Sequence, residues 1–285
     1  MRAEATHLEF GKKKTTRIAA TSCWHIGFKA IHEAGIHYML KRFRQKRIPW
    51  WHLGDLVEGI HPDDPRFGLE QHQTTILQEM NLSVDWIKEA KKTCGGLIMG
   101  NHEWRLGNTI GNVTKQLADR AGVDYLGATC MMDVHCPDGA MKLFLKHTNI
   151  IMGGCSGEPE RQALNRCIRL RARLKSFGGD LKLVGHGHQA VIAPPVFKKQ
   201  LQTEGTKTKL RPTPCHGEWC AMAPAMYVNY SDDVDVVGYA EIYGYPPTDL
   251  GWIEAIIERD GTVAAVEHRM EDGKVALRVE PTVVA

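Results

Sequence analysis

Residues 181–188 have the sequence LKLVGHGH, an apolar run of strand length that ends in two glycine–histidine pairs. Four other segments share this design, in which an apolar run leads directly into a polar or metal-ligating residue. They are residues 17–25 (RIAATSCWH), 48–55 (IPWWHLGD), 96–103 (GLIMGNHE) and 141–147 (MKLFLKH). The length and apolar character of each run predict a buried strand whose last residues emerge at one edge of a sheet.

Helical patterns separate these strands. Residues 28–43, 69–92 and 158–177 have apolar residues at spacings of three and four. In the third segment the predicted apolar stripe consists of Leu164, Cys167, Ile168 and Leu174. Strands that alternate with helices favour an α/β fold with βαβ units. Ligands of such sheets bind at the carboxyl ends of the strands, where the five polar clusters are expected to converge.

The last third of the chain has a different pattern. From about residue 189 onward, short β-rich runs are separated by Pro, Gly and Asp, which predicts antiparallel strands that could form a second sheet packed on the first. No internal repeat or long linker marks a boundary. We therefore expect one domain over residues 1–285, with a flexible N-terminus at 1–15 and a β-rich C-terminal portion at 189–285.

Composition places the chain among ordinary globular proteins. It has 285 residues, 43% hydrophobic and 24% charged, enough to bury a sizeable core. No apolar stretch has the length of a membrane span and no signal peptide is evident, so we expect a cytoplasmic protein without a membrane partner. The eight cysteines include no CxxC pair, which favours reduced thiols. Oligomeric state cannot be predicted from these features.

The ends of the five predicted strands supply seven metal-ligating side chains. Imidazole, carboxylate, thiol and amide groups suit transition metals. Seven ligands are too many for one tetrahedral ion, whereas two ions sharing one carboxylate would use them all. The candidate ligands are Cys23, His25, Asp55, Asn101, His147, His186 and His188.

In their order along the chain, these clusters resemble the motifs of the calcineurin-like metallophosphoesterases. That family has D-x-H, then GD, then GNH followed by an acidic residue, then a lone H, then GHxH. The corresponding residues here are Cys23-Trp24-His25, Gly54-Asp55, Gly100-Asn101-His102-Glu103, His147 and Gly185-His186-Gly187-His188. Four of the five motifs match outright, and the resemblance spans about residues 17–189. Residues 218–259, with a PP-x-x-x-G turn, also look like the tail of phage-type members.

The resemblance implies a metallophosphoesterase fold, with two packed mixed β-sheets flanked by helices and a metal site at the strand ends. It further implies one metal held by residue 23, His25, Asp55 and His188, and a second held by Asp55, Asn101, His147 and His186, with a hydroxide between them. His102 would protonate the leaving oxygen or hold transition-state charge. The implied cofactors are two divalent or transition metal ions.

Position 23 departs from the family pattern, which usually has Asp there. A cysteine at this position is similar to lariat-debranching enzymes, which cleave 2′,5′-phosphodiesters. A thiolate ligand would favour Zn or Fe over Mg, with Mn as a further candidate. Alternatively the thiol stays protonated, and the first metal binds weakly or only with substrate.

Several other side chains are candidates for substrate contacts. Arg105 could pair with a phosphate. His61 and His72 flank a segment (HPDDPRFGLEQH) that follows Asp55. Basic stretches at residues 41–47 and 161–175 could track a nucleic-acid backbone, although solvated surface is the commoner role of such stretches. A local group of Cys215, His216 and Cys220 lacks the spacing of a zinc site.

The sequence therefore predicts a phosphoester hydrolase, with a nuclease-like phosphodiesterase favoured and nucleic acid as a candidate substrate. Two alternatives remain open. One is a phosphomonoesterase acting on a protein or small molecule, and the other is a non-catalytic scaffold whose first metal site is weakened by Cys23.

Overall fold

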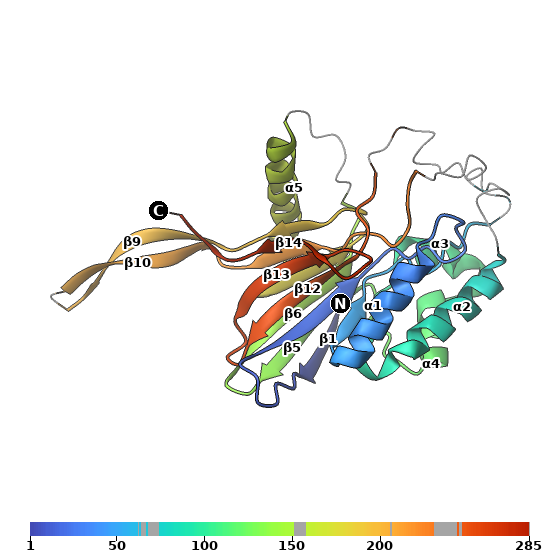
Figure 1. The fold of residues 1–285 in the computed structure, drawn as a ribbon, viewed down its shortest axis with the longest axis horizontal. Helices are drawn as coiled ribbons and strands as arrows, with labels where there is room; N and C mark the ends of the chain where they lie inside the picture. Colours follow the sequence, from blue (N-terminus) through green and yellow to red (C-terminus); the bar gives the residue numbers. More distant parts are fainter. Residues whose placement is uncertain are drawn as a thin grey trace.

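The computed structural model describes residues 1–61, 63, 67, 74–150, 158–205, 207–230, 244 and 247–284. Two six-stranded sheets pack face to face, and helices cover their outer faces (Figure 1). This confirms the predicted α/β architecture of two mixed sheets flanked by helices.

The first sheet has the strand order β14-β13-β12-β2-β3-β4. Its strands are β2 (Thr15–Thr21), β3 (Trp50–His52), β4 (Cys94–Leu97), β12 (Trp252–Glu258), β13 (Val263–Arg269) and β14 (Val275–Val279). Strands β2, β3 and β4 are parallel, and β12 adds to β2 in the antiparallel direction. Three of the predicted apolar runs therefore end at the same edge of this sheet.

The second sheet has the order β1-β5-β6-β7-β11-β8. Its strands are β1 (Arg2–His7), β5 (Thr129–Cys136), β6 (Gly139–His147), β7 (Leu181–Gly185), β8 (Val191–Ala193) and β11 (Trp219–Met222). Strands β6 and β7 are parallel, with His147 paired to Gly185. The remaining two apolar runs therefore end together as well.

Alternation along the strands builds the layers. In β2, Ile18 and Ala20 lie in the core between the sheets, whereas Ala19 faces the helices. The same alternation separates Trp51 from Trp50. Helices α1 (Glu33–Lys46), α2 (Ile76–Glu89) and α4 (Val113–Ala121) cover the outer face of the first sheet, and the short helix α3 (Asn101–Ile110) packs on α4.

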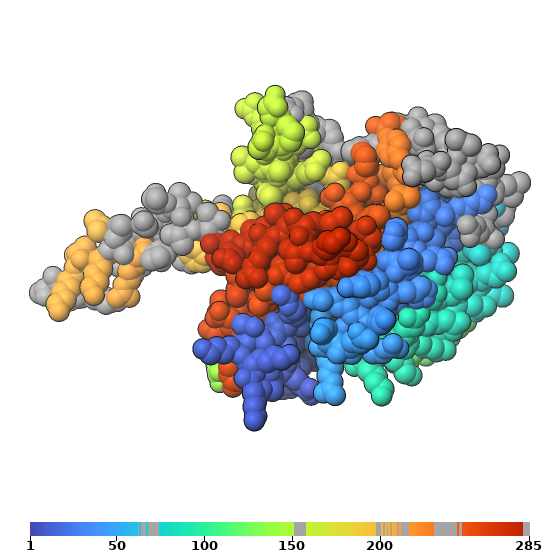
Figure 2. Space-filling model, in the orientation of Figure 1, coloured from blue at the N-terminus to red at the C-terminus, as the bar shows by residue number. Residues whose placement is uncertain are grey.

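Helix α5 (Pro159–Leu174) covers the second sheet with a face that overlaps half of the predicted apolar stripe. Leu170 and Leu174 are buried against this sheet, with Cys167 partly buried beside them. Leu164 and Ile168, placed by the sequence pattern in the apolar stripe, are 58% and 52% exposed. Two members of the predicted stripe, Cys167 and Leu174, therefore face the sheet, whereas Leu164 and Ile168 do not, because the buried face is turned toward Leu170. The N-terminal half of α5 stands out from the body (Figure 2).

Two further expectations differ from the structure. Residues 2–7, expected in a flexible segment, form β1 and pair in parallel with β5. The C-terminal strands do not form one second sheet packed on the first: β8 and β11 extend the second sheet, β12–β14 extend the first, and the remaining three form a small separate sheet. An apolar run shows that a strand is buried, but not which neighbour it pairs with.

A hairpin of β9 (Val196–Glu204) and β10 (Lys207–His216) projects from the body (Figure 1). The last strand, β15 (Thr282–Val284), returns to pair in parallel with β9. Within the described residues, no helix combines the length and the apolar character that crossing a bilayer requires.

Candidate metal centre

Five loops at the carboxyl ends of strands form one cluster of polar side chains. Cys23 and His25 follow β2, and Asp55 follows β3. Asn101 begins α3, four residues after β4 ends. His147 is the last residue of β6, and the histidines at 186 and 188 follow β7. Every ligand candidate predicted from the sequence therefore lies at the same edge.

The motif glycines allow these loops to approach one another. A Cβ atom on Gly100 would lie 2.1 Å from the backbone nitrogen of Asp55. A Cβ atom on Gly54, which has a φ of +95°, would lie 2.6 Å from Nδ1 of His147. Both distances are shorter than any non-bonded contact, so only glycine fits at either position.

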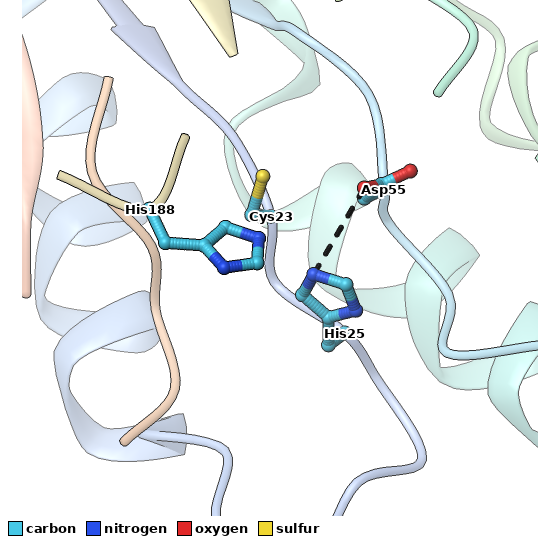
Figure 3. A group of neighbouring side chains, drawn as sticks. All are labelled: Cys23, His25, Asp55 and His188. Atoms are coloured by element: carbon cyan, nitrogen blue, oxygen red, sulfur yellow. Dashed lines mark ion pairs between the residues drawn. The ribbon is translucent and has the colours of Figure 1, made fainter. Parts of the chain in front are cut away.

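The first group of candidate ligands consists of Cys23, His25, Asp55 and His188 (Figure 3). Their ligand atoms all lie within 4.8 Å of one another. Nε2 of His25 and Nε2 of His188 are buried without a hydrogen-bond partner among the described residues. Nε2 of His25 lies 4.0 Å from Oδ2 of Asp55, beyond hydrogen-bond distance. Two buried nitrogens in one cluster thus have no hydrogen-bond partner in the part of the chain that the structure describes.

A second group of Asp55, His147 and His186 shares the aspartate with the first. Nε2 of His147 lies 3.1 Å from Oδ2 of Asp55 and 3.2 Å from Nδ1 of His186. The same nitrogen is 3.0 Å from Oδ1 of Asn101. One imidazole nitrogen can donate only a single proton, yet it faces a carboxylate, an amide oxygen and a ring nitrogen.

Backbone strain is concentrated in this cluster. Among the described residues, six that are not glycine have a positive φ, and five of them are candidate ligands. Their φ angles are 54° for Cys23, 50° for His25, 57° for Asp55, 96° for His186 and 53° for His188. Each such conformation costs on the order of 1–3 kcal/mol and persists only where the surrounding structure imposes it. This concentration of strain is typical of a functional site.

Three neighbouring groups lie within hydrogen-bond distance of histidine rings, on the side of each ring that faces away from the cluster. Nδ1 of His25 lies 2.6 Å from Oε2 of Glu58, and Nδ1 of His188 lies 2.8 Å from the hydroxyl of Tyr227. Nδ1 of His147 lies 2.6 Å from the carbonyl oxygen of Leu53. In all three histidines Nδ1 is engaged and Nε2 is directed into the cluster. Partners of this kind fix the ring orientation of metal-ligating histidines.

The charges in the cluster favour an ionised aspartate. Burial raises the pKa of Asp55, but the neighbouring His147 and His102 outweigh it, so that the pKa lies well below its usual value. The pKa of His147 is raised, because Asp55 outweighs the opposing effect of burial. A buried carboxylate at the shared position therefore keeps its negative charge.

The other two histidines are held neutral. Burial, together with His25, lowers the pKa of His188 well below its usual value. Burial, together with His147, lowers the pKa of His186 to about 4. Neutral imidazole is the form that binds metals.

Cys23 is fully buried, and burial together with the Asp55 carboxylate raises the pKa of its thiol well above the usual value. Its Sγ lies 3.1 Å from the hydroxyl oxygen of Ser22. A thiolate at this position requires a nearby cation to stabilise it.

Taken together, these residues fit bound metal cations. The unpartnered Nε2 atoms, the neutral imidazoles and the ionised shared carboxylate supply lone pairs and negative charge toward common points. Thiol, imidazole, carboxylate and amide oxygen are the donor set that suits transition metals.

His102 and Glu103 lie beside the ligands. The backbone nitrogen of His102 donates to Oδ1 of Asp55 at 3.0 Å, and its Nδ1 lies 2.5 Å from the carbonyl oxygen of Glu58. The Glu103 carboxylate accepts hydrogen bonds from the backbone nitrogens of Gly100 and Asp55, at 2.8 and 3.1 Å. Glu103 therefore ties the start of α3 to the loop that carries the shared aspartate.

The predicted substrate-contacting residues lie outside this cluster. Arg105 is exposed on α3. His61 is exposed, with Nδ1 3.2 Å from Oδ2 of Asp63. His72 lies outside the described residues, as do the side chains of Cys215 and His216.

Sequence reasoning missed Glu58 and Tyr227. Glu58 follows the shared aspartate by three residues, and this short offset within one loop is a signal that could have identified it. Tyr227 lies 39 residues after its partner His188, and nothing in the sequence marks it.

No model of a protein family matches the sequence, and no curated protein matches it. Solved structures with similar chain paths include a conserved uncharacterised protein, a predicted phosphoesterase, from Streptococcus pneumoniae (11% identity, 93% of this chain and 97% of that one, TM-score 0.41). Others are wild-type Vps29 complexed with zinc from Entamoeba histolytica (14%, 93% and 99%, TM-score 0.41) and GAP50, the anchor in the inner membrane complex of Plasmodium (9%, 96% and 90%, TM-score 0.44). Similarities this low indicate neither an activity nor a ligand for the present chain.

Proposed function

We propose that this protein is a metal-dependent phosphoester hydrolase that acts on phosphodiesters. The observation that supports the proposal is the pair of ligand groups that share Asp55, with two buried Nε2 atoms left unpartnered among the described residues. The motifs also occur in the same order as in the metallophosphoesterases, and this resemblance supports phosphoester hydrolysis as the reaction.

Cations bound in the two groups would place positive charge near the phosphoryl oxygens and would make water more acidic. The protein's own contribution is to hold the ligands in place before substrate arrives. Glu58 and Tyr227 hold the rings of His25 and His188, and the Leu53 carbonyl holds His147. Glu103 fixes the loop of Asp55 through backbone hydrogen bonds.

His102 is suited to the proton transfer that hydrolysis requires. Water adds to phosphorus, the bond from phosphorus to the leaving oxygen breaks, and that oxygen must gain a proton. Burial lowers the pKa of His102, but Asp55 and Glu58 outweigh it, so the pKa is raised. With Nδ1 engaged by the Glu58 carbonyl, Nε2 is the nitrogen that can deliver the proton.

Cys23 makes Zn or Fe the favoured occupant of the first group, with Mn as a further candidate, because a thiolate is a softer ligand than a carboxylate. The second group offers only oxygen and nitrogen donors. The two positions should therefore differ in metal preference.

The exposed arginines of α5 favour nucleic acid as the phosphodiester substrate. Arg169 and Arg173 lie on the exposed surface of this helix. A cationic helix face can follow a phosphate backbone without reading its sequence.

The test combines metal analysis with turnover. The protein is purified without chelators, metal per chain is measured by elemental analysis, and hydrolysis of bis-p-nitrophenyl phosphate is compared with that of p-nitrophenyl phosphate. About two metals per chain with faster diester cleavage is the expected result. Faster monoester cleavage would favour a phosphomonoesterase, and one metal or none without turnover would favour the scaffold.

A further inference from the structure

Trp104 is 69% exposed, whereas the six other tryptophans, all among the described residues, are buried. Tryptophan has the largest side chain to bury, so leaving it in water gives up more hydrophobic stabilisation than any other residue would. Trp104 also lies one residue beyond the Asn101-His102-Glu103 motif. Packing of the protein interior therefore does not explain why this position is tryptophan.

The helical geometry of α3 places Trp104 next to the candidate metal centre. Glu103 and Leu106 are the buried residues of this helix and define its inner face. Asn101, Trp104 and Arg105 are spaced i, i+3 and i+4, so they share the opposite face. The rise from Asn101 to Trp104 is about 4.5 Å along the axis.

Side-chain direction brings the indole closer to the centre. Long side chains on a helix lean toward its N-terminus and cover the preceding turn. For Trp104 and Arg105 the preceding turn begins at Asn101, whose Oδ1 lies 3.0 Å from Nε2 of His147. If a phosphate is bound at the metal centre, a substituent of that phosphate that extends along α3 would therefore contact the indole of Trp104.

We propose that Trp104 is a stacking platform for a nucleobase, so that the substrate is a nucleotidyl phosphodiester whose base adjoins the scissile phosphate. The inference rests on the proposed function, which it narrows from any phosphodiester to one that carries a planar base. An indole face binds any base without reading its identity. Arg105, exposed on the same face, matches the negative charge of a neighbouring phosphate.

Two chromogenic diesters with the same leaving group separate this proposal from its alternatives. One is the p-nitrophenyl ester of thymidine 5′-phosphate, and the other is methyl p-nitrophenyl phosphate, which lacks a base. The variants are Trp104→Ala and Trp104→Phe. Leu77→Ala is the matched control, because Leu77 is 65% exposed on α2.

Trp104→Ala is expected to lower kcat/KM for the thymidine ester by about 5- to 150-fold, the range measured for loss of one base stack, mainly through KM. The same variant should leave the methyl ester within about twofold of the parent. Trp104→Phe should retain most of the preference, because a phenyl ring also stacks. Leu77→Ala should leave kcat/KM unchanged for both substrates. Thymidine 5′-monophosphate should also quench tryptophan fluorescence in the parent and not in Trp104→Ala.

Failure of the inference differs from failure of the proposed function. If the parent cleaves both diesters and Trp104→Ala leaves their ratio unchanged, the stacking platform is wrong while the hydrolase stands. If the parent cleaves neither, the hydrolase is wrong, and the quenching titration then decides the base site by itself. Absence of quenching by the monophosphate in the parent would overturn it.

Discussion

The hydroxyl of Tyr227 lies 2.8 Å from Nδ1 of His188, which leaves Nε2 of the same ring buried and aimed at Cys23 and Asp55. Tyr227 is half-buried, and its ring meets those of His25 and His188 edge to face, with centroids 4.8 and 5.1 Å away. One aromatic residue from the C-terminal third thus orients a histidine from the sheet edge.

Replacing Tyr227 with Phe removes the hydroxyl and keeps the ring. Metal affinity of the first ligand group should fall about 10- to 100-fold, the usual effect of losing a partner that orients a ligand histidine. Zinc titration by calorimetry measures this. Tyr125→Phe is the control, because its hydroxyl contacts Asn112 and Met99, away from the cluster. Equal zinc affinity in the parent and Tyr227→Phe would show that the hydrogen bond has no role in binding.

Replacing Glu58 with Ala should lower the metal affinity of the first ligand group by a similar factor, because Nδ1 of His25 loses a carboxylate partner at 2.6 Å. Glu58→Gln should recover part of the affinity, since its amide oxygen still accepts the hydrogen bond. The chain offers a matched control in Glu89→Ala, which removes a carboxylate 2.8 Å from Nδ1 of His37 on the surface. Parallel losses in both Ala variants would mean that the effect is one of general stability.

Cys23→Asp should shift metal preference from Zn toward Mn, because a carboxylate is a harder ligand than a thiolate. Asp also tolerates the positive φ of 54° at this position better than Cys does. Competition between the two metals, followed by elemental analysis, gives the ratio bound. A ratio that does not change on substitution would indicate that the thiol is not a ligand.

His102→Gln should lower kcat for phosphodiester hydrolysis by about 100- to 10,000-fold, the usual contribution of a general acid, with metal content unchanged. Gln keeps a polar group beside the Glu58 carbonyl but cannot deliver a proton. A substrate with a better leaving group needs less protonation and should lose less. A variant that loses metal along with activity would instead place His102 among the ligands.

Glu79 predicts a pH dependence of stability. It is buried and accepts a hydrogen bond from the backbone nitrogen of Gly59 at 2.8 Å, and burial raises its pKa from 4.5 to about 8. Above pH 4.5 the unfolded chain loses this proton while the folded chain keeps it. Its contribution to the free energy of unfolding therefore falls as pH rises from 4.5 to about 8, by up to about 1.4 kcal/mol per unit, and then levels off.

Glu79→Gln should lack this fall, so the advantage of the variant over the parent should grow between pH 5 and pH 8. Urea unfolding followed by circular dichroism at several pH values measures the difference. Gln can still accept the hydrogen bond from Gly59, which keeps packing comparable. A constant difference across this range would mean that Glu79 is ionised in the folded protein.

Much of the architecture was predictable because it depends on short-range patterns. The five apolar runs became β2, β3, β4, β6 and β7, and helices α1, α2 and α5 overlap the three predicted segments, with α1 continuing past residue 43 to Lys46. Helix α3 was missed because Asn101 and His102, interpreted as the end of a strand segment, begin a helix that Glu103 caps through the backbone nitrogen of Gly100. Only Cys167 and Leu174 of the predicted stripe of α5 face the sheet, because contact with the sheet, and not the residue pattern alone, decides which face of the helix is covered.

The sequence by itself determined which side chains could gather at the strand ends, since alternation and strand length are local properties that send each run of polar residues to one edge. Only the tertiary structure decided which of these side chains group with Asp55. It also decided that Glu58 and Tyr227 contact Nδ1 of two histidines, and that the Trp104 indole is exposed to solvent. Those relations join residues about 200 positions apart, such as His25 and Tyr227, whose rings are in contact. Sheet order and loop packing bring such residues together, and no local pattern of residues encodes either.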